Sequence, residues 1–335
     1  MSSDPAYPVS PLLNVQHLSV GFSRAGKLMQ AVDDVSFSVA AGETLGVVGE
    51  SGSGKTTIGR AILRLLPRAN TVAAGQITYQ GKDLSALSDG EMRRMRSRLQ
   101  MIFQDPLSSF NPRRKVEDLV AEGLVIQGKP KAERRARVEA ALADVGFDLA
   151  AVAGRRPHQF SGGQCQRIAI ARALAVEPEL IVCDEPVASL DVSVQAHVIN
   201  LLQDIREARK LALIFISHDL AVVKNVSDRV AVLYMGKIVE MGEGPAIYER
   251  PAHPYTRTLL EAVPVADASR KLRPDAKRTA TPSRNRPPRG CSFRGRCSRA
   301  TQLCAEVEPK LQPVPRGQQV ACHYPHDEPA PGLLG

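Results

Sequence analysis

An eight-residue run near residue 50 restricts the possible folds of this chain more than any other part of the sequence. It reads Gly-Glu-Ser-Gly-Ser-Gly-Lys-Thr over residues 49–56, which matches a glycine, four residues and then Gly-Lys-Ser/Thr. The run follows an apolar segment, residues 44–48, and precedes residues 56–66, where apolar side chains recur at helical spacing before Pro67. A strand, a glycine-rich loop and a helix in this order predict a phosphate-binding loop, or P-loop, in an α/β fold.

The residue types of this loop suit a nucleoside triphosphate. Glycines allow successive backbone N–H groups to converge on phosphate oxygens, and the helix N-terminus adds a favourable dipole. Lys55 can reach the β and γ phosphates, and the Thr56 hydroxyl can ligate Mg²⁺. A flexible Gly/Ser turn is the alternative interpretation, and the flanking strand and helix disfavour it. We expect ATP and Mg²⁺ to contact Gly49, Ser51, Gly52, Ser53, Gly54, Lys55, Thr56 and Thr57.

A second apolar segment, residues 180–183, ends in two adjacent acids, Asp184 and Glu185. The carboxyl end of a strand is where a doubly wound sheet places its ligands. Asp184 is expected to hold Mg²⁺, directly or through water, while Glu185 polarises the attacking water. A salt-bridged core is the alternative, but two unpaired carboxylates beside a buried strand would be costly without a metal and phosphate nearby.

The rest of the first 250 residues indicates an α/β core with a helical insertion. Residues 12–48 contain apolar runs broken by glycines, which indicates strands and turns, and residues 213–216 form another apolar strand. Residues 194–209 are predicted to be helical, and residues 116–145 show helical spacing with no convincing strand. No internal repeat is apparent, so we expect one nucleotide-binding module.

Charge and hydropathy limit the kinds of partner that this chain can have. The net charge is +9, and residues 270–299 contain eleven Lys or Arg against one acid, Asp275. This segment could contact anionic lipid headgroups or nucleic acid, or it could be a solvated Arg- and Pro-rich linker. There is no run of about 18 apolar residues and no signal-peptide pattern at the N-terminus. We therefore expect a soluble protein whose membrane role comes through partners.

Five further elements complete a recognisable pattern. In order along the chain they are the aromatic Phe22, Gln104 after an apolar strand, the segment Phe160-Ser161-Gly162-Gly163-Gln164, Ser189-Leu190-Asp191 after the acids, and His218 after residues 213–217. With the P-loop, this set resembles the ATP-binding cassette ATPases over residues 12–265. Phe160 replaces the leucine usual in the signature segment of that family, which should alter packing more than phosphate contact.

The resemblance implies a P-loop NTPase core with a helical subdomain at about residues 105–165. It implies a head-to-tail dimer, in which ATP lies between the P-loop of one chain and Ser161, Gly162, Gly163 and Gln164 of the other. It also implies roles for single residues. Gln104 would ligate Mg²⁺ and sense the γ phosphate, His218 would steady that phosphate, Asp191 would lie near the nucleotide, and Phe22 would stack on adenine unless it is a core residue.

Three segments, residues 104–113, 160–167 and 253–256, look like those of the oligopeptide/dipeptide importer ATPases, in particular the second of two paired ATPases. This implies a heterodimer with a paired ATP-binding subunit, two transmembrane permease subunits and an extracytoplasmic solute-binding protein. The chain would lie at the cytoplasmic face of the membrane. Alternatives are a nickel, glutathione or antimicrobial-peptide transporter of the same branch and, more remotely, a soluble cassette of DNA repair or translation. No nucleic acid is expected.

Six cysteines fall into two groups. Cys165 and Cys183 lie within cassette motifs and are expected to be inert packing residues. Residues 266–335 form a predicted extension, and without an export signal its thiols are more plausible metal ligands than disulfides. Its four cysteines are Cys291, Cys297, Cys304 and Cys322, separated by five, six and seventeen residues. Four thiolates can hold a [4Fe-4S] cluster or zinc. No Cys-x-x-Cys pair is present, and the resemblance favours iron–sulfur; zinc and free thiols are the alternatives.

Overall fold

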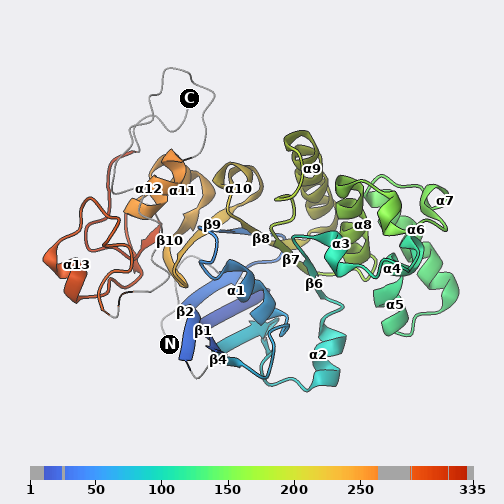
Figure 1. The fold of residues 1–335 in the computed structure, drawn as a ribbon, viewed down its shortest axis with the longest axis horizontal. Helices are drawn as coiled ribbons and strands as arrows, with labels where there is room; N and C mark the ends of the chain where they lie inside the picture. The colour runs from blue at the N-terminus through green and yellow to red at the C-terminus, as the bar shows by residue number, and fades with distance from the viewer. Residues whose placement is uncertain (1–10, 25–26, 263–286, 288, 316, 330–335) are drawn as a thin grey trace.

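The structure, a computed structural model, describes residues 11–24, 27–262, 287, 289–315 and 317–329. Figure 1 shows three regions: a large sheet through the middle, an antiparallel sheet below it, and a group of helices on the right. The C-terminal segment lies on the left, beside the last core helices.

The large sheet contains the strand that precedes the P-loop. Within the described residues it has eight strands in the order β11-β12-β10-β9-β3-β8-β7-β6. The five strands from β9 to β6 are parallel to one another, and β10 and β12 are antiparallel to their neighbours. The strands are β3 (Thr44–Val48), β6 (Leu99–Ile102), β7 (Leu180–Asp184), β8 (Ala212–Ser217), β9 (Arg229–Tyr234), β10 (Lys237–Glu243), β11 (Gln312–Pro313) and β12 (Gln319–Val320). Every residue of β3, β7 and β8 is buried, as expected for parallel strands covered on both faces.

The register of the parallel strands brings their carboxyl ends together. Val48 pairs with Ser217, Asp184 pairs with Ile216, and Ile102 pairs with Cys183. The chain segments that follow β3, β6, β7 and β8 therefore leave the sheet at one edge. The P-loop, Gln104, Glu185 and His218 all belong to these segments.

The antiparallel sheet consists of β1 (Leu13–Arg24), β2 (Lys27–Val39), β4 (Thr71–Tyr79) and β5 (Lys82–Asp83), in the order β2-β1-β4-β5. Its buried side chains form one hydrophobic core with α1 (Lys55–Ile62) and one face of the large sheet. α1 ends at Ile62, earlier than the apolar spacing predicts, because Arg64 adopts a left-handed conformation with φ 51°.

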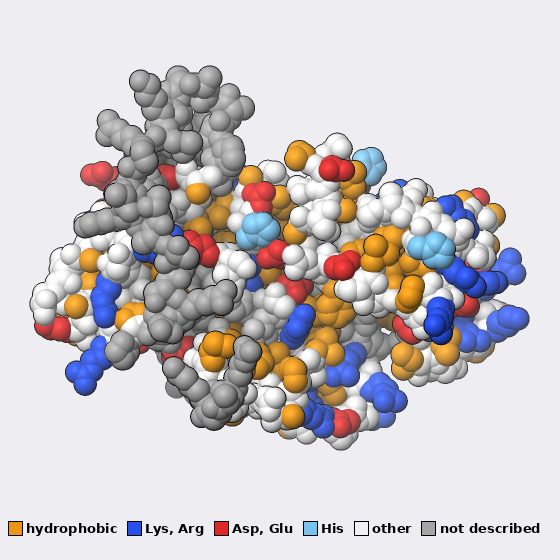
Figure 2. Space-filling view, in the orientation of Figure 1, with side chains coloured by type: hydrophobic (Ala, Val, Ile, Leu, Met, Phe, Trp, Pro, Cys, Tyr) orange, Lys and Arg blue, Asp and Glu red, His pale blue; other side chains and the backbone are white. Residues whose placement is uncertain are grey.

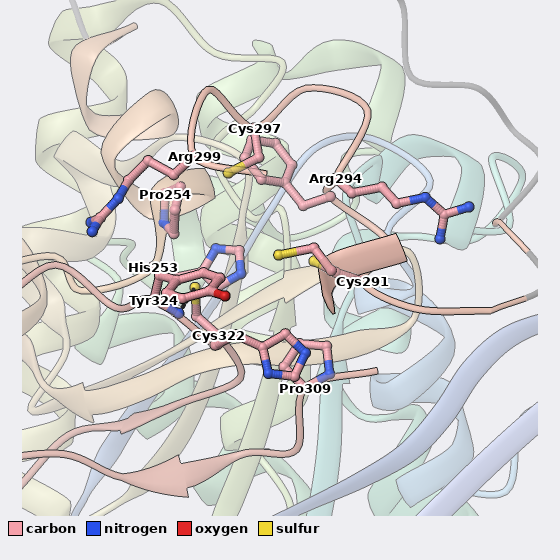
Figure 3. A pocket seen from close by; sticks show the side chains of 12 residues that line it. His253, Pro254, Cys291, Arg294, Cys297, Arg299, Pro309, Cys322 and Tyr324 are labelled. Atoms are coloured by element: carbon pink, nitrogen blue, oxygen red, sulfur yellow. Dashed lines mark hydrogen bonds between the residues drawn. The ribbon is translucent and has the colours of Figure 1, made fainter. Parts of the chain in front are cut away.

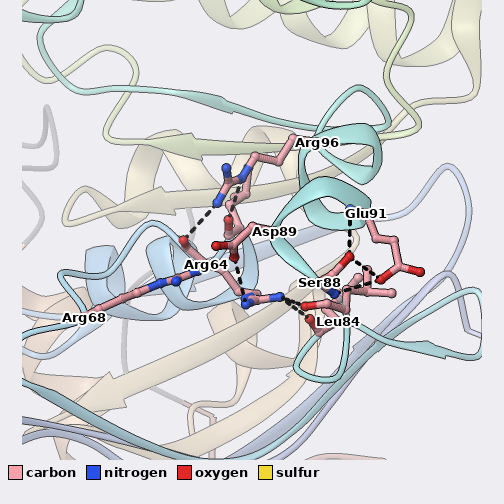
Figure 4. A network of polar contacts seen from close by, with 9 residues as sticks. Arg64, Arg68, Leu84, Ser88, Asp89, Glu91 and Arg96 are labelled. Atoms are coloured by element: carbon pink, nitrogen blue, oxygen red, sulfur yellow. Dashed lines mark hydrogen bonds and ion pairs between the residues drawn. The ribbon is translucent and has the colours of Figure 1, made fainter.

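A short helix, α2 (Asp89–Met95), precedes β6 and starts with a capping box. The Ser88 side chain accepts a hydrogen bond from the Glu91 backbone N–H, and the Glu91 carboxylate accepts one from the Ser88 N–H. Figure 4 shows this box beside Arg64 and Arg96. Arg64 donates hydrogen bonds to backbone carbonyls just before α2, and Arg96 donates to backbone carbonyls just after α1. These contacts attach α2 to α1.

The helical region occupies the stretch between β6 and β7. It contains α3 (Pro106–Ser109), α4 (Val116–Val120), α5 (Glu122–Ile126), α6 (Lys131–Asp144), α7 (Leu149–Val152), a 3-10 turn at Pro157–Gln159 and α8 (Gly162–Leu174). Its apolar residues join α9 (Val192–Arg209) in the second hydrophobic core. Figure 2 shows Lys and Arg side chains over this region, at the right-hand end of the molecule.

The chain after β8 builds the left side of Figure 1. It contains α10 (Leu220–Val226), α11 (Gly244–Glu249), α12 (Pro254–Glu261) and, beyond the undescribed residues 263–286, α13 (Gln302–Glu306). β12 pairs with β10, so the C-terminal segment extends the sheet that contains the P-loop strand. Most of the basic run at 270–299 falls outside the described residues. Among those that are described, no helix has the length and apolar content needed to cross a bilayer.

Candidate nucleotide site

The P-loop has a backbone that requires glycine. Gly49, Gly52 and Gly54 have φ angles of 151°, 80° and 106°. A Cβ on Gly49 would lie 2.1 Å from the Leu233 carbonyl oxygen, and one on Gly54 would lie 2.4 Å from the Ala31 carbonyl oxygen. These two glycines are therefore needed both for their dihedral angles and for the close approach of neighbouring backbone.

Lys55 begins α1 and is held against the P-loop. Its side chain is 4% exposed, and Nζ donates hydrogen bonds to the carbonyls of Gly49 at 2.7 Å and Glu50 at 3.0 Å. Nζ also lies 4.0 Å from Glu185 Oε1. Burial lowers the pKa of Lys55, and the charges of Glu185 and Asp184 oppose that change. The ammonium group is thus positioned between the loop and the two acids.

Thr56 and Asp184 meet at the next position. The Thr56 hydroxyl donates a hydrogen bond to Asp184 Oδ1 at 2.7 Å. Asp184 is 4% exposed, and burial raises its pKa, while the Thr56 hydrogen bond acts in the opposite direction. A hydroxyl and a carboxylate in contact form an oxygen donor set of the kind that Mg²⁺ prefers, so these residues fit the expected ion.

Glu185 and His218 form the third pair of the site. His218 Nδ1 lies 3.1 Å from Glu185 Oε2, and both residues directly follow buried strands. Glu185 has φ 49°, a left-handed conformation that is unfavourable for a residue with a side chain. Its N–H still donates to the Ile216 carbonyl at 2.9 Å, so the turn occurs immediately after β7. Glu185 is 14% exposed and adjoins Lys55, as a residue acting on a bound water would need to be.

Gln104 and Phe22 lie farther out. Gln104 is exposed and comes two residues after β6, at the same edge of the sheet as Asp184. Phe22 is partly buried on β1, where it pairs with Met29 and Thr71 and packs against the first core. The structure therefore assigns Phe22 a packing role, and its contact with adenine stays a prediction.

The segment 160–164 starts α8, in the helical region and away from α1 in Figure 1. The Ser161 side chain accepts a hydrogen bond from the Gln164 N–H at 3.3 Å, and the Gln164 side chain accepts one from the Ser161 N–H at 2.9 Å. Ser161 and Gly162 are exposed. A Cβ on Gly163 would lie 2.4 Å from a Val194 methyl, so glycine is needed for packing on α9. Asp191, the N-cap of α9, is also exposed and makes no side-chain cap bond.

Phe160 is held from two sides. The Arg155 guanidinium lies 4.0 Å from the centre of its ring, and the Phe147 ring packs against it nearly at a right angle, with the ring centres 6.1 Å apart. The residue packs against the second core without being fully buried. Its substitution for the usual leucine is thus accommodated by packing within the helical region.

Comparison with known proteins decides the family. Residues 32–188 match the family model described as ABC transporter. A peptide import ATP-binding protein of Brucella ovis is 48% identical over 314 residues, which cover 93% of this chain and 98% of the relative. This chain belongs to the ATP-binding cassette transporter family. The cassette is also 48% identical to the oligopeptide transport ATP-binding protein OppF of Escherichia coli, over 87% of each chain.

Further matches cover the C-terminal part and the fold of the cassette. Residues 239–304 match the model described as the C-terminal region of oligopeptide/dipeptide transporters. The solved structure of CbiO1 from Clostridium perfringens, part of the ABC transporter complex CbiONQ, has a TM-score of 0.62 and 26% identity, over 71% of this chain and 90% of that one. The solved structure of the cassette MJ0796, a post-hydrolysis dimer bound to ADP and phosphate, has a TM-score of 0.62 and 25% identity, over 69% of this chain and 98% of that one. A P-loop NTPase fold was expected from the sequence and is confirmed.

Two contacts of this cassette's P-loop were not predicted. Residues 253–256, which look like those of the importer ATPases, form a helix-initiating turn: His253 Nδ1 accepts the Tyr255 N–H at 3.0 Å, and Pro254 is the first residue of α12. In addition, the Tyr255 hydroxyl accepts the Glu50 N–H at 2.9 Å, and Arg296 forms an ion pair with Glu50. No sequence signal joins residues separated by 205 and 246 positions.

The four C-terminal cysteines surround one pocket, as Figure 3 shows for Cys291, Cys297 and Cys322; Cys304 also lines it. Burial raises the pKa of the thiols of Cys291, Cys297 and Cys322. In the described part of the chain, however, no three His, Cys, Asp or Glu side chains are grouped closely enough to hold a metal ion. The donor chemistry suits an iron–sulfur cluster or zinc, and the present arrangement does not form a ligand set for either.

The other two cysteines, Cys165 and Cys183, are buried and free. Burial raises the pKa of both thiols, that of Cys183 to about 12, so neither forms a thiolate readily. This environment agrees with their interpretation as packing residues.

Proposed function

We propose that this cassette couples ATP hydrolysis at its P-loop edge to the import of di- and oligopeptides. One observation carries the proposal. Lys55, the Thr56–Asp184 pair and the Glu185–His218 pair come from the helix after the P-loop and from the ends of two parallel strands, β7 and β8, and they meet at one edge of the sheet. One bound phosphate would thereby be close to a cationic group, an oxygen donor set for Mg²⁺ and a candidate water-polarising carboxylate.

The chemistry of the bound site follows from these side chains. Lys55 would transfer its hydrogen bonds from the loop carbonyls to the β and γ phosphate oxygens, and Thr56 and Asp184 would hold Mg²⁺, which neutralises charge on the phosphates. Glu185 would accept a hydrogen bond from the attacking water, and His218 would steady Glu185 and the γ phosphate. Gln104 would report loss of the γ phosphate to the helical region, while Thr57 and Phe22 would complete contacts to phosphate and adenine.

The signature segment would act on a neighbouring chain. Ser161, Gly162 and Gly163 are presented at a helix N-terminus, which favours an anion, but the P-loop of the same chain lies elsewhere in the fold. A paired ATP-binding subunit would bring its nucleotide to this segment, and Asp191 would lie near that contact. Hydrolysis would remove the phosphate shared by the two chains and separate them.

Peptides are proposed as the transported class because the C-terminal family match and the named relatives concern peptide transport. Two permease subunits, an extracytoplasmic solute-binding protein and a position at the cytoplasmic face of the membrane would follow. Nickel, glutathione and antimicrobial peptides are outcomes of an uptake assay with labelled solutes.

We also propose that Cys291, Cys297, Cys304 and Cys322 close around a [4Fe-4S] cluster. Support comes from the four thiols that line one pocket. Protein purified without oxygen should be brown and contain about four irons per chain. One zinc per chain, or four free thiols, would reject this part of the proposal.

The assigned chemistry is tested by Glu185→Gln, which removes the carboxylate but keeps the side-chain shape. ATP binding should persist, and turnover in the assembled transporter should fall by about a thousandfold, with loss of uptake of a labelled oligopeptide by cells. Glu177→Gln is a matched control, because Glu177 also has a left-handed backbone, with φ 55°. Wild-type turnover in Glu185→Gln would reject the assignment.

A further inference from the structure

The loop at residues 291–297 contacts the P-loop although it lies more than 240 residues later in the chain. Arg296 donates two hydrogen bonds to the Glu50 carboxylate, at 2.9 and 2.8 Å. The Arg296 side chain is 11% exposed and that of Glu50 is 28% exposed, so solvent screens this ion pair only in part. Two parallel N–H···O bonds also fix the direction of the carboxylate, which a single contact would not do.

An aromatic cluster attaches the same loop to the core. Phe293 is 2% exposed, and its ring centre lies 5.3 Å from that of Tyr234 and 5.4 Å from that of Tyr255. Tyr234 ends β9, the neighbour of the P-loop strand, and Tyr255 lies in the first turn of α12. The loop therefore reaches Glu50 from a position fixed on elements that already adjoin the P-loop.

Glu50 is consequently held at three points. The Tyr255 hydroxyl accepts its N–H, Arg296 bonds its carboxylate, and Lys55 Nζ donates to its carbonyl. Glu50 lies between Gly49 and Ser51, inside the loop whose N–H groups are expected to receive phosphate. A restraint on this residue limits the orientations of the peptide groups on both sides of it.

We propose that Arg296 is a positioning residue for ATP binding: through Glu50, the C-terminal segment keeps the P-loop in its phosphate-binding conformation. This inference rests on the proposed ATP site. If only a fraction of loops were in the competent conformation, the apparent Kd for ATP would rise by the inverse of that fraction. Loss of the ion pair should therefore weaken ATP binding without any loss of a group that touches phosphate.

The test is equilibrium binding of a fluorescent ATP analogue, with Mg²⁺, to the full-length chain. Arg296→Gln and Glu50→Gln should each raise Kd by about tenfold, and Arg296→Lys, which keeps the charge but not the paired donors, by about threefold. Arg294→Gln is the control, because Arg294 is in the same loop and bonds the Arg289 carbonyl instead. Its Kd should change by less than about twofold.

A double-mutant cycle separates positioning from a merely structural role. If Arg296 acts through Glu50, the double variant should bind as weakly as either single variant and no more weakly. Unchanged Kd in folded Arg296→Gln protein, or additive effects in the double variant, would overturn the inference. Lys55→Ala tests the proposed ATP site separately from the role of Arg296. ATP binding by that variant at wild-type affinity would reject the proposed site itself.

Discussion

The P-loop and the signature segment both present backbone N–H groups at the start of a helix, yet their surroundings differ. The P-loop contains a buried lysine, adjoins two acids and is contacted by Tyr255 and Arg296 from the C-terminal part of the chain. In the signature segment Ser161 and Gly162 are exposed, and the side chains of Ser161 and Gln164 bond to each other's backbone. The P-loop is thus surrounded by contacts from its own chain, whereas the signature segment presents part of its backbone to solvent.

Under the proposed function, this difference shows how a divided site would be built. The P-loop, which would bind phosphate first, would need a fixed conformation, and distant parts of the chain supply contacts that restrain it. The signature segment, which would join later, would need accessibility and a stable helix start, which a local capping box provides. Mutations in the two elements should accordingly affect different steps.

The largest effect is expected at Lys55. Lys55→Ala removes the buried cation of the P-loop and should weaken ATP binding by about a thousandfold. Titration with a fluorescent nucleotide measures this directly. Lys224→Ala, at an exposed position of α10, serves as the control. Comparable losses in both variants would point to unfolding and not to phosphate contact.

At the signature segment, Ser161→Ala should leave the ATP affinity of the isolated chain unchanged but lower turnover of the assembled transporter by about 100-fold or more. Loss of the helix cap should also cost about 1 kcal/mol of stability. Ser88→Ala removes a capping box of the same type on α2 and should lose similar stability with normal turnover. Weaker ATP binding by isolated Ser161→Ala protein would contradict the division of roles.

The stability of the fold should depend on pH through Glu240, a buried residue of β10. Its carboxylate accepts the N–H groups of Ala252 and His253 just before α12, the helix that contains Tyr255. Burial raises the pKa of Glu240 to about 7. The folded state therefore holds a proton that the unfolded state has released, so Glu240 stabilises the fold less as pH rises from about 4.5 to 7. Between pH 5 and 7 this loss should be about 2 kcal/mol.

Urea unfolding of wild type and Glu240→Gln at several pH values isolates this contribution. The buried His253, whose pKa burial lowers to about 3, has the opposite dependence: its stabilisation is lost as pH falls below about 6.5. The difference between the two proteins removes the His253 contribution. A difference that does not vary between pH 5 and 7 would be evidence against a buried, titrating Glu240.

The smallest effect is expected at Tyr255. Tyr255→Phe removes the acceptor of the Glu50 N–H and should cost about 1 kcal/mol of stability and raise the Kd for ATP by about threefold. Tyr248→Phe removes a hydrogen bond to the Leu220 carbonyl from another buried tyrosine, so it should lose similar stability with unchanged Kd. Equal Kd values for the two variants would show that this contact does not reach the nucleotide.

The elements that depend on short-range patterns of apolar and charged residues could be predicted from the sequence. The strand at residues 44–48, the acidic pair at the end of β7 and the helix over residues 194–209 appear where apolar runs and spacing place them. Sequence reasoning missed the end of α1, where a left-handed Arg64 stops the helix before Pro67. It also missed the joining of β12 to β10 and the Arg296–Glu50 pair, because contacts between remote segments leave no periodic signal.

The most direct test of the divided site uses an ATP analogue with a photoreactive group on the γ phosphate, bound to the purified transporter with its paired ATPase. Adducts should form on this chain at both the P-loop and residues 161–164. In Lys55→Ala, the P-loop adduct should disappear while the adduct at 161–164 remains, because the nucleotide that labels it is bound by the paired subunit. Loss of both adducts in that variant would contradict the account.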